Sequence, residues 1–332
     1  MTFHTLIPQR RGYLFKALLL SVSLLALTAA YADKDDQYLE FDDTMLEEEL
    51  VYPDWFKLNL GDLNDDIKSA AAAGKSGIMV YFGQKRCAYC EQFLKENIGA
   101  PDIEHYIREH YDIIPVDIWG IEDIVDTNGE TYTERELSIR YKTNFTPSVV
   151  FYDLEGKPVF RLRGYYPPYK FRAALQYVTE GFYKEETFQA YLERAEPGTF
   201  FMLAGLNERD FFAEPPYNLD RSKQPATKHL AVFFEQGDCH ACDLLHSGPL
   251  NEEEALAEIN NMETVQLNMW SDTAVITPDG RETTAREWAK ELNLFYSPTI
   301  IFFDYNGKEI IRIESVVQYY RLWGVLDYVN KK

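Results

Sequence analysis

Cysteine is scarce in this chain of 332 residues, which contains only four: Cys87, Cys90, Cys239 and Cys242. They form two pairs, and in each pair two residues separate the cysteines. A structural disulfide stabilises most when it closes a long loop, so pairs this short would cross-link little of the fold. The Cys-x-x-Cys spacing instead favours reversible thiol chemistry.

Basic residues are also few, because 33 Lys and Arg face 54 Asp and Glu, for a formal net charge of −21. A surface this acidic repels phosphate backbones, so we expect no nucleic-acid partner. Apolar residues are not lacking: 46% of the chain is hydrophobic and 15% is aromatic, which excludes a disordered protein. The length favours two domains of ordinary size.

Long hydrophobic runs are missing apart from residues 17–29, which follow the basic residues Arg10, Arg11 and Lys16. This run is short for a transmembrane helix and is followed by the small-x-small pattern AYA at residues 30–32. We therefore predict a signal peptide over residues 1–32, cleaved near Ala32, and no stable membrane insertion of the mature chain. Export by the twin-arginine route and retention as an uncleaved anchor stay open.

An internal repeat organises the rest of the chain. The apolar run IMVYF and the loop GQKR precede the first Cys pair, while LAVFF and EQGD precede the second. Further along, Thr146-Pro147 stands before SVVFYD, and Ser297-Pro298 stands before TIIFFD. Equivalent positions are shifted by about 151 to 152 residues, which indicates a duplicated domain.

Each half has the same expected order of elements: strand, Cys pair, helix, strand, turn and helix, Pro, two strands joined by a Gly turn, and a final helix. Alternation of strand and helix implies a parallel βαβ unit, and the closely spaced last strands imply a hairpin. The sequence therefore predicts an α/β fold with one mixed sheet in each domain. Helices are expected at residues 63–73, 171–178 and 321–329. We expect an acidic lead, a first domain, a Pro-rich connection and a second domain at residues 33–61, 62–185, 186–227 and 228–332.

The Cys pairs suit a helix start. Residues three apart on a helix share one face, with Cβ atoms about 5–6 Å apart, and a modest adjustment brings them to disulfide distance. The first Cys faces unpaired N–H groups and the positive end of the helix dipole, which stabilise a thiolate. We predict that Cys87 and Cys239 attack, and that Cys90 and Cys242 resolve the mixed disulfide.

The motifs of both halves resemble those of thioredoxin-fold oxidoreductases. Domain one is similar to the SoxW-type periplasmic thioredoxin-like proteins through MVYFGQKRCAYC, DTNGETYTERELSIRY, NFTPSVVFYDLEGK and RLRGYYPPYKFRAALQYV. The resemblance covers residues 62–181 well and residues 228–330 more loosely. It implies two tandem thioredoxin-like domains, each with a central mixed β-sheet flanked by helices.

This resemblance further implies thiol–disulfide exchange with protein substrates in the periplasm, and we expect neither a cofactor nor a metal. Tyr89 and Thr146 are similar to the disulfide isomerase and reductase branch, which favours those directions of exchange. Cis peptide bonds are implied before Pro147 and Pro298, with Thr146 and Ser297 lining the substrate groove. A reductase in an oxidising compartment also needs a membrane thiol–electron donor.

Three features depart from thioredoxin itself. The cysteines enclose Ala-Tyr and His-Ala in place of Gly-Pro. Neither apolar strand carries the buried acid that thioredoxin places behind its thiols. Domain two has Glu314-Ser315 where domain one has Arg163-Gly164, which puts its substrate groove in doubt.

The loops before the two Cys pairs carry opposite charges. Lys85 and Arg86 precede the first pair, whereas Glu235 and Asp238 precede the second, partly offset by His240. Nearby cations stabilise a thiolate and nearby anions oppose it, so we predict a lower thiol pKa in the first pair. The competing interpretation is that water and salt screen these loop charges.

Other uses of the cysteines fit less well. One tetrahedral zinc site would need the two pairs closer in sequence. Covalent haem attachment needs His directly after the second Cys, where Glu91 and Asp243 stand. The rival from another class is a binding protein that docks a partner while its cysteines stay inert or structural, above all in domain two. The patch YYPPY at residues 165–169 is interpreted as packing, and no role is assigned to His105, His110, His229 or His246.

Overall fold

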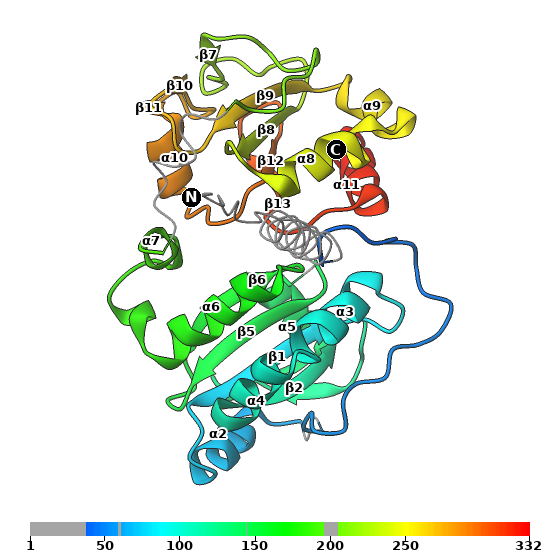
Figure 1. Cartoon of the computed structure of the whole chain (residues 1–332), viewed down its shortest axis with the longest axis vertical. Coiled ribbons are helices and arrows are strands. Elements are labelled where there is room, and N and C mark those ends of the chain that lie inside the picture. The colour runs from blue at the N-terminus through cyan, green and yellow to red at the C-terminus, as the bar shows by residue number, and fades with distance from the viewer. Residues whose placement is uncertain (1–37, 59–60, 144, 196–204) are drawn as a thin grey trace, which may run out of the picture. The chain divides into compact units, whose positions relative to one another are not determined.

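The computed structural model describes residues 38–58, 61–143, 145–195 and 205–332 (Figure 1). The chain divides into two units, Met1–Phe41 and Asp42–Lys332. Only residues 38–41 of the first unit are described, so the predicted signal peptide at residues 1–32 lies outside the described residues. Within the described ranges, no helix has the length and apolar character needed to cross a membrane.

Domain one is built on a four-stranded mixed sheet of order β2-β1-β5-β6. The β1 strand pairs parallel with β2 and antiparallel with β5, and β5 pairs antiparallel with β6. The hairpin of β3 and β4 forms a separate two-stranded sheet. The elements are α2 (Leu63–Ala72), β1 (Gly77–Gly83), α3 (Ala88–Gln92), the π-helix η2 (Phe93–Ile98), α4 (Pro101–His110), β2 (Tyr111–Asp117), β3 (Asp123–Val125), β4 (Thr131–Thr133), α5 (Glu134–Arg140), β5 (Ser148–Asp153), β6 (Pro158–Arg163) and α6 (Pro168–Thr179).

Helices cover both faces of this sheet, which explains why β1 is a continuous apolar run rather than an alternating one. On one face, Val80 and Phe82 pack with residues of α2 and α5. On the other face, Tyr81 stacks on Phe93, and Phe93 meets Phe171 of α6 edge to face. The first Cys pair therefore follows a strand that is buried on both sides.

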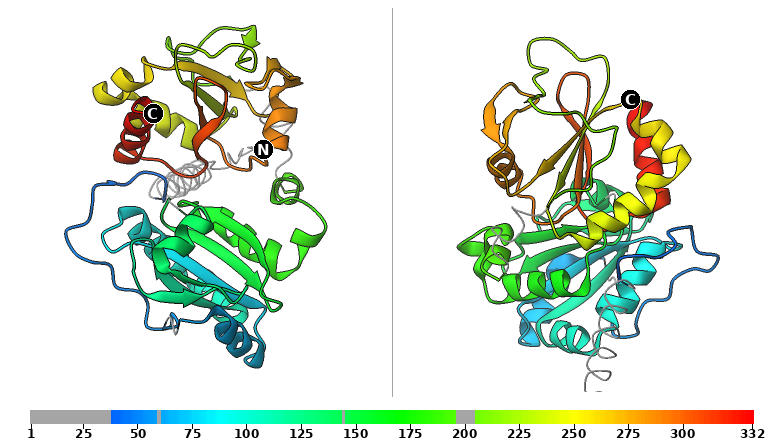
Figure 2. Two further views of the ribbon diagram at one scale, coloured as in Figure 1. Left: turned by 180° about the vertical axis from the view of Figure 1, so that it is seen from behind. Right: turned by 45° about the horizontal axis from the view of Figure 1, so that its top comes forward.

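Domain two repeats this topology with a sheet of order β13-β12-β8-β9 and the same parallel and antiparallel pairings. Figure 2 shows α9 and α11 side by side on one face of that sheet, and the core of this face includes residues of both helices. The elements are β8 (Leu230–Glu235), α8 (His240–Ser247), the 3-10 helix η5 (Pro249–Asn251), α9 (Glu253–Ile259), β9 (Glu263–Asn268), β10 (Ala274–Ile276), β11 (Glu282–Thr284), α10 (Ala285–Glu291), β12 (Thr299–Phe303), β13 (Glu309–Ile313) and α11 (Tyr319–Asn330).

The two copies confirm the predicted α/β fold, with one mixed sheet flanked by helices in each domain. They differ at their start, because domain two has no counterpart of α2 among the described residues 219–229. In that segment Arg221 is 4% exposed, and its guanidinium donates to Glu263 Oε2 at 2.5 Å. The last helices, α6 and α11, begin three and two residues earlier than predicted, and in α6 a proline occupies the first turn.

The region predicted as a polar connection contains more structure than expected. It includes α7 (Phe188–Glu193) and β7 (Tyr217–Asn218), which adds to the edge of β10. The aromatic ring of Phe212 packs edge to face on Phe233 of β8. Residues 205–227 are therefore integrated with domain two, because they carry apolar side chains that its core can bury. The helix α7 instead packs on domain one, where Phe188 contacts Phe160 and Tyr177.

Within the unit Asp42–Lys332, the two domains meet through equivalent segments of the repeat. Arg163 Nε donates to Glu314 Oε1 at 2.6 Å, and the backbone N–H of Val316 donates to Tyr165 O at 3.0 Å. Tyr166 stacks on Phe295 with ring centroids 5.5 Å apart. Contact between equivalent surfaces is typical of a two-fold dimer interface, here formed within one chain.

Candidate functional site

The first Cys pair lies at the junction of β1 and α3. Cys87 is the N-cap residue of α3, and the N–H of Cys90 donates to Cys87 Sγ at 3.0 Å. The sulfur thus satisfies one of the amides that a helix start leaves unpaired. The two cysteines form a disulfide with a Cα–Cα distance of 5.1 Å. Cys87 is 4% exposed and Cys90 is fully buried, so only Cys87 reaches the surface.

The loop that precedes β5 lies against this disulfide. Thr146 Oγ1 is 3.3 Å from Cys87 Sγ, and the Thr146–Pro147 peptide bond is cis. Pro147 O accepts a hydrogen bond of 2.8 Å from the N–H of Gly164 at the end of β6. The fold therefore brings together the Cys pair, the Thr-Pro loop and the Arg-Gly segment, which are well separated in the sequence.

Cys87 lines a cleft of about 1040 Å³. Trp119, which follows β2, lines the same cleft and is 62% exposed. The opposite side includes Arg321 and Val325 of α11, an element of domain two. The cleft beside Cys87 is therefore lined by residues of both domains.

Tyr89, between the two cysteines, is held by residues outside domain one. Its hydroxyl donates to Asp43 Oδ2 at 2.9 Å and accepts a hydrogen bond of 2.7 Å from the N–H of Gln318. The guanidinium carbon of Arg321 lies 3.3 Å from the centroid of its ring, a cation–π contact. Burial raises the pKa of Tyr89, so the hydroxyl stays neutral in this cluster.

The second Cys pair has the same construction. Cys239 is the N-cap residue of α8, and its Sγ accepts a hydrogen bond of 3.1 Å from the N–H of Cys242. Their disulfide has a Cα–Cα distance of 5.2 Å. Ser297 Oγ is 3.2 Å from Cys242 Sγ, and the Ser297–Pro298 peptide bond is cis. Cys239 is 8% exposed and Cys242 is fully buried.

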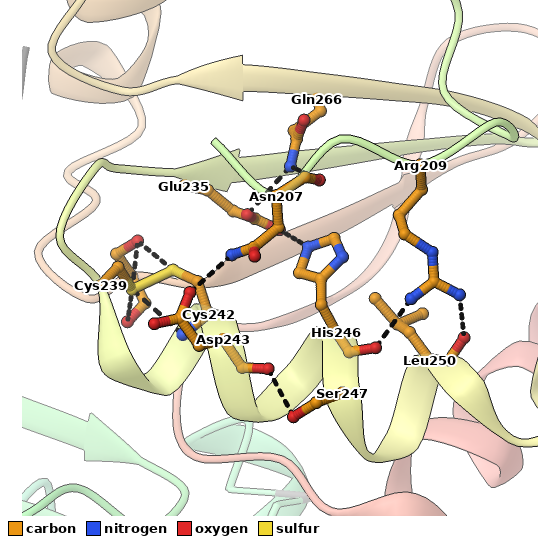
Figure 3. Close-up of polar contacts among 11 residues, drawn as sticks. Asn207, Arg209, Glu235, Cys239, Cys242, Asp243, His246, Ser247, Leu250 and Gln266 are labelled. Atoms are coloured by element: carbon orange, nitrogen blue, oxygen red, sulfur yellow. Dashed lines mark hydrogen bonds and ion pairs between the residues drawn. A yellow bond between two sulfur atoms is a disulfide. The ribbon is translucent and has the colours of Figure 1, made fainter. Parts of the chain in front are cut away.

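A buried polar network lies beside this second disulfide (Figure 3). His246 Nε2 of α8 and Glu235 Oε1 at the end of β8 are 2.9 Å apart, and both side chains are at most 5% exposed. Gln266 of β9 donates to Glu235 Oε2 at 3.1 Å. Asn207 and Arg209 of the connection complete the network: Asn207 O accepts from Gln266, and Arg209 donates to His246 O.

This network corrects one prediction from the sequence. No buried acid is expected in either strand before the Cys pairs, yet Glu235 is the last residue of β8 and is fully buried. From the sequence alone it counts as an exposed loop charge that opposes the Cys239 thiolate. Glu235 is instead buried in contact with His246 and Gln266, so Asp238 is the one acid of this pair that stands in the loop as predicted. Domain one has Gly83, and no acid, at the equivalent position.

Several residues of the two sites were missed from the sequence. His246 received no role, although a Glu in place of Gly83 at a strand end was a signal that a polar partner would be needed. Asp43 was recognised only as part of the acidic lead at residues 33–61. Arg321 was placed in a helix of domain two, and nothing in the sequence indicated that it contacts Tyr89.

The patch at residues 165–169 packs as interpreted only in part, because Tyr169 at its end is 60% exposed. Tyr165 and Tyr166 are buried, and Tyr166 stacks on Phe295 of domain two. In the parts of the chain that the structure describes, no group of three or more His, Cys, Asp or Glu side chains is arranged to hold a metal ion.

Comparison with known proteins identifies the two domains. The family model of the thioredoxin-like domain matches residues 63–179 and 218–330. No curated protein sequence is significantly similar to the chain.

Among solved structures, a thioredoxin-fold protein of Helicobacter pylori is 26% identical, with a TM-score of 0.33, over 36% of this chain and 84% of its own. A thioredoxin of Thermus thermophilus is 24% identical, with a TM-score of 0.29, over 37% and 87%. A thioredoxin of Fasciola hepatica is 20% identical, with a TM-score of 0.26, over 36% and 97%. The sequence match, rather than these alignments, decides the assignment. Because that match covers both halves and most of the chain, the protein belongs to the thioredoxin-like domain family and carries the domain twice, each copy with a disulfide-bonded Cys-x-x-Cys motif.

Proposed function

We propose that this protein is an exported thiol–disulfide oxidoreductase that acts on protein disulfides in the reductase or isomerase direction. The observation that carries the proposal is the common construction of the two sites. In each, the first Cys is a helix N-cap whose sulfur accepts the N–H of the second Cys, beside a Thr or Ser that precedes a cis-proline. A disulfide that only cross-links the fold would not require this arrangement.

The reduced form of site one would react in two balanced steps. The Cys87 thiolate attacks one sulfur of a substrate disulfide, forms a mixed disulfide and releases the other substrate sulfur as a thiolate. The Cys90 thiolate then attacks Cys87 Sγ, which restores the Cys87–Cys90 disulfide and releases the second substrate thiolate. The substrate gains two electrons and the motif loses two, so a dithiol donor must reduce the motif again.

Thr146 and Ser297, with Pro147 and Pro298, are proposed to line the groove in which the substrate chain lies. Their contacts with the cysteine sulfurs support this role. In domain two, Cys239 and Cys242 are proposed to act as attacker and resolver in the same way.

The proposed export and cellular location are inferred from the sequence. We propose a signal peptide at residues 1–32, an acidic lead to residue 61, and thioredoxin-like domains at residues 62–185 and 228–332. SoxW-type specificity, a periplasmic location and a membrane thiol–electron donor belong to this proposal. The supporting features are the basic and apolar N-terminal sequence and the motifs of domain one.

Insulin reduction tests the proposal with variants that each disable one site. Cys87→Ser is expected to remove most of the activity, because it lacks the attacking thiolate of the site whose first Cys lines a cleft. Cys239→Ser is expected to retain most of it. The double variant serves as the zero-activity control.

If neither single substitution changes insulin reduction and the double variant retains activity, the cysteines do not catalyse the exchange. A docking protein with inert disulfides would then be the better description.

A further inference from the structure

The cleft at Cys87 is closed on one side by domain two, and Arg321 is the charged residue that α11 contributes to it. We propose that Arg321 is a positioning residue of site one, which holds Thr146 and Tyr89 in place and favours the thiolate form of Cys87 from across the domain interface. The inference rests on the proposed function, because it concerns the reactivity of the same Cys pair.

Two contacts connect Arg321 to the neighbours of Cys87. Its Nη2 donates to Thr146 O at 2.7 Å, and the hydroxyl of the same threonine lies 3.3 Å from Cys87 Sγ. Its guanidinium also covers the ring of Tyr89, two residues after Cys87. One cation therefore holds both the Thr-Pro loop and the turn that carries the thiol.

The charge of Arg321 is only partly compensated. Its Nη1 is buried without a hydrogen-bond partner among the described residues, and the carboxylate whose charge acts on the guanidinium is that of Asp43. The two oxygens of this carboxylate accept from backbone N–H groups of Tyr320 and Arg321 and from the Tyr89 hydroxyl, so Asp43 offsets the charge of Arg321 without bonding to the guanidinium. Arginine remains protonated even when burial lowers its pKa, so a positive charge persists in the cleft.

Other charged groups also line the cleft. The cations are Lys85 and Arg86, and the carboxylates are Asp43, Glu49, Asp117, Glu122 and Glu134. Lys85 lies 3.7 Å from Glu49, and both side chains are more than half exposed, so water screens this pair. Arg321 is largely buried, so its field is screened less and acts more strongly on a thiolate at Cys87.

The repeat supplies a matched control. Lys170 of α6 occupies the position equivalent to Arg321, and its Nζ donates to Phe295 O of domain two at 3.3 Å. Both cations therefore reach across the interface to a backbone carbonyl of the opposite Pro loop. Lys170 does not line the cleft at Cys87, so its removal should leave this thiol unchanged.

The experiment measures the pH dependence of Cys87 alkylation by iodoacetamide in the reduced full-length chain, with the Cys87 peptide quantified by mass spectrometry. Arg321→Met is expected to raise the thiol pKa by about one unit, which slows alkylation near pH 7 by about ten-fold. Arg321→Lys keeps the charge and is expected to restore part of the shift. Lys170→Met is expected to match the parent protein.

An unchanged thiol pKa in Arg321→Met overturns the proposal, and so does an Arg321→Lys value equal to that of Arg321→Met. If Arg321→Met does not fold, Arg321→Gln replaces it, because its amide can still donate to Thr146 O but carries no charge. The thiol pKa of Cys87 is then also expected to rise, and an unchanged value overturns the proposal. The alkylation assay contains no protein substrate. If the thiol pKa of Cys87 shifts as expected but the protein does not reduce insulin, that result counts against the proposed function alone.

Discussion

At the scale of single residues, the two sites differ most in the side chains packed beside the disulfide. Site two has Glu235, His246 and Gln266, whereas the equivalent positions of domain one are Gly83, Leu94 and Pro115. A buried carboxylate is tolerated only when its oxygens are paired, which explains why the three polar residues occur together in one domain.

We expect Glu235 and His246 to be energetically coupled. Glu235→Gln and His246→Gln should each lower the free energy of unfolding, because each leaves a buried polar partner unsatisfied. The double variant should lose about 1–3 kcal/mol less than the sum of the single losses. Urea unfolding of the three variants measures this coupling, and strictly additive losses would show that the 2.9 Å contact contributes nothing.

At the scale of elements, α2 carries an acid on its buried side. Asp66 is 3% exposed, and one of its carboxylate oxygens has no hydrogen-bond partner among the described residues. Burial raises the pKa of Asp66 from 3.8 to about 6, although Lys57 opposes this rise. The folded state therefore holds the proton more tightly than the unfolded chain. The free energy of unfolding then decreases as the pH rises from about 3.8 to about 6.

Asp66→Asn is expected to stabilise the protein at pH 7 by about 1–2 kcal/mol, because a neutral amide avoids the burial of a charge. Near pH 4 the gain should be much smaller, since the folded parent is then mostly protonated at this site. Urea unfolding at both pH values measures the difference. Asp65→Asn on the exposed side of the same helix is the control and should change stability by less than about 0.5 kcal/mol. An equal effect of Asp66→Asn at both pH values would contradict the assignment.

At the scale of the whole unit Asp42–Lys332, the interface between the domains depends on the small size of Gly164. Its φ is +95°, and a Cβ atom added there would lie 2.0 Å from Ser315 Oγ, the equivalent position of domain two. The contact therefore has room for a side chain in only one domain, and Ser315 of domain two fits because domain one has Gly164 at the equivalent position. The charge also differs between the repeats, because domain one has Arg163 where domain two has Glu314. These two side chains pair across the contact, whereas two like charges at these positions would repel each other.

Gly164→Ala is expected to destabilise the protein more than Gly181→Ala, by about a further 1–3 kcal/mol. Both glycines have positive φ, at +95° and +81°, so both substitutions carry a backbone cost. Only Gly164 has a side chain in the way, since nothing lies within 4 Å of a Cβ at Gly181. Urea unfolding measures the two losses.

Ser315→Gly in the Gly164→Ala background should recover most of the additional loss, because it removes the atoms that clash. If it recovers nothing, the two domains do not meet at these residues in solution.

Much of the architecture could be predicted because it depends on local pattern. The strands, the helix starts and the duplicated α/β fold were predicted from apolar runs, the Cys pairs, Gly turns and their repetition at a constant shift. Within each domain, the Thr-Pro and Ser-Pro loops were expected near the thiols, and the structure places Thr146 and Ser297 beside the sulfurs. The connection was less predictable, because β7 is a two-residue strand that exists only through its pairing with β10.

The sequence by itself determined two thioredoxin-like domains, the helix N-cap positions of Cys87 and Cys239, and the net acidity of the chain. These properties follow from residues close together in the chain and from composition. Only the tertiary structure decided that Glu235 is a paired, buried acid and that Arg321 reaches Tyr89 and Thr146 from the other domain. Such contacts join residues that are far apart in sequence, and the local sequence around one residue does not identify the other.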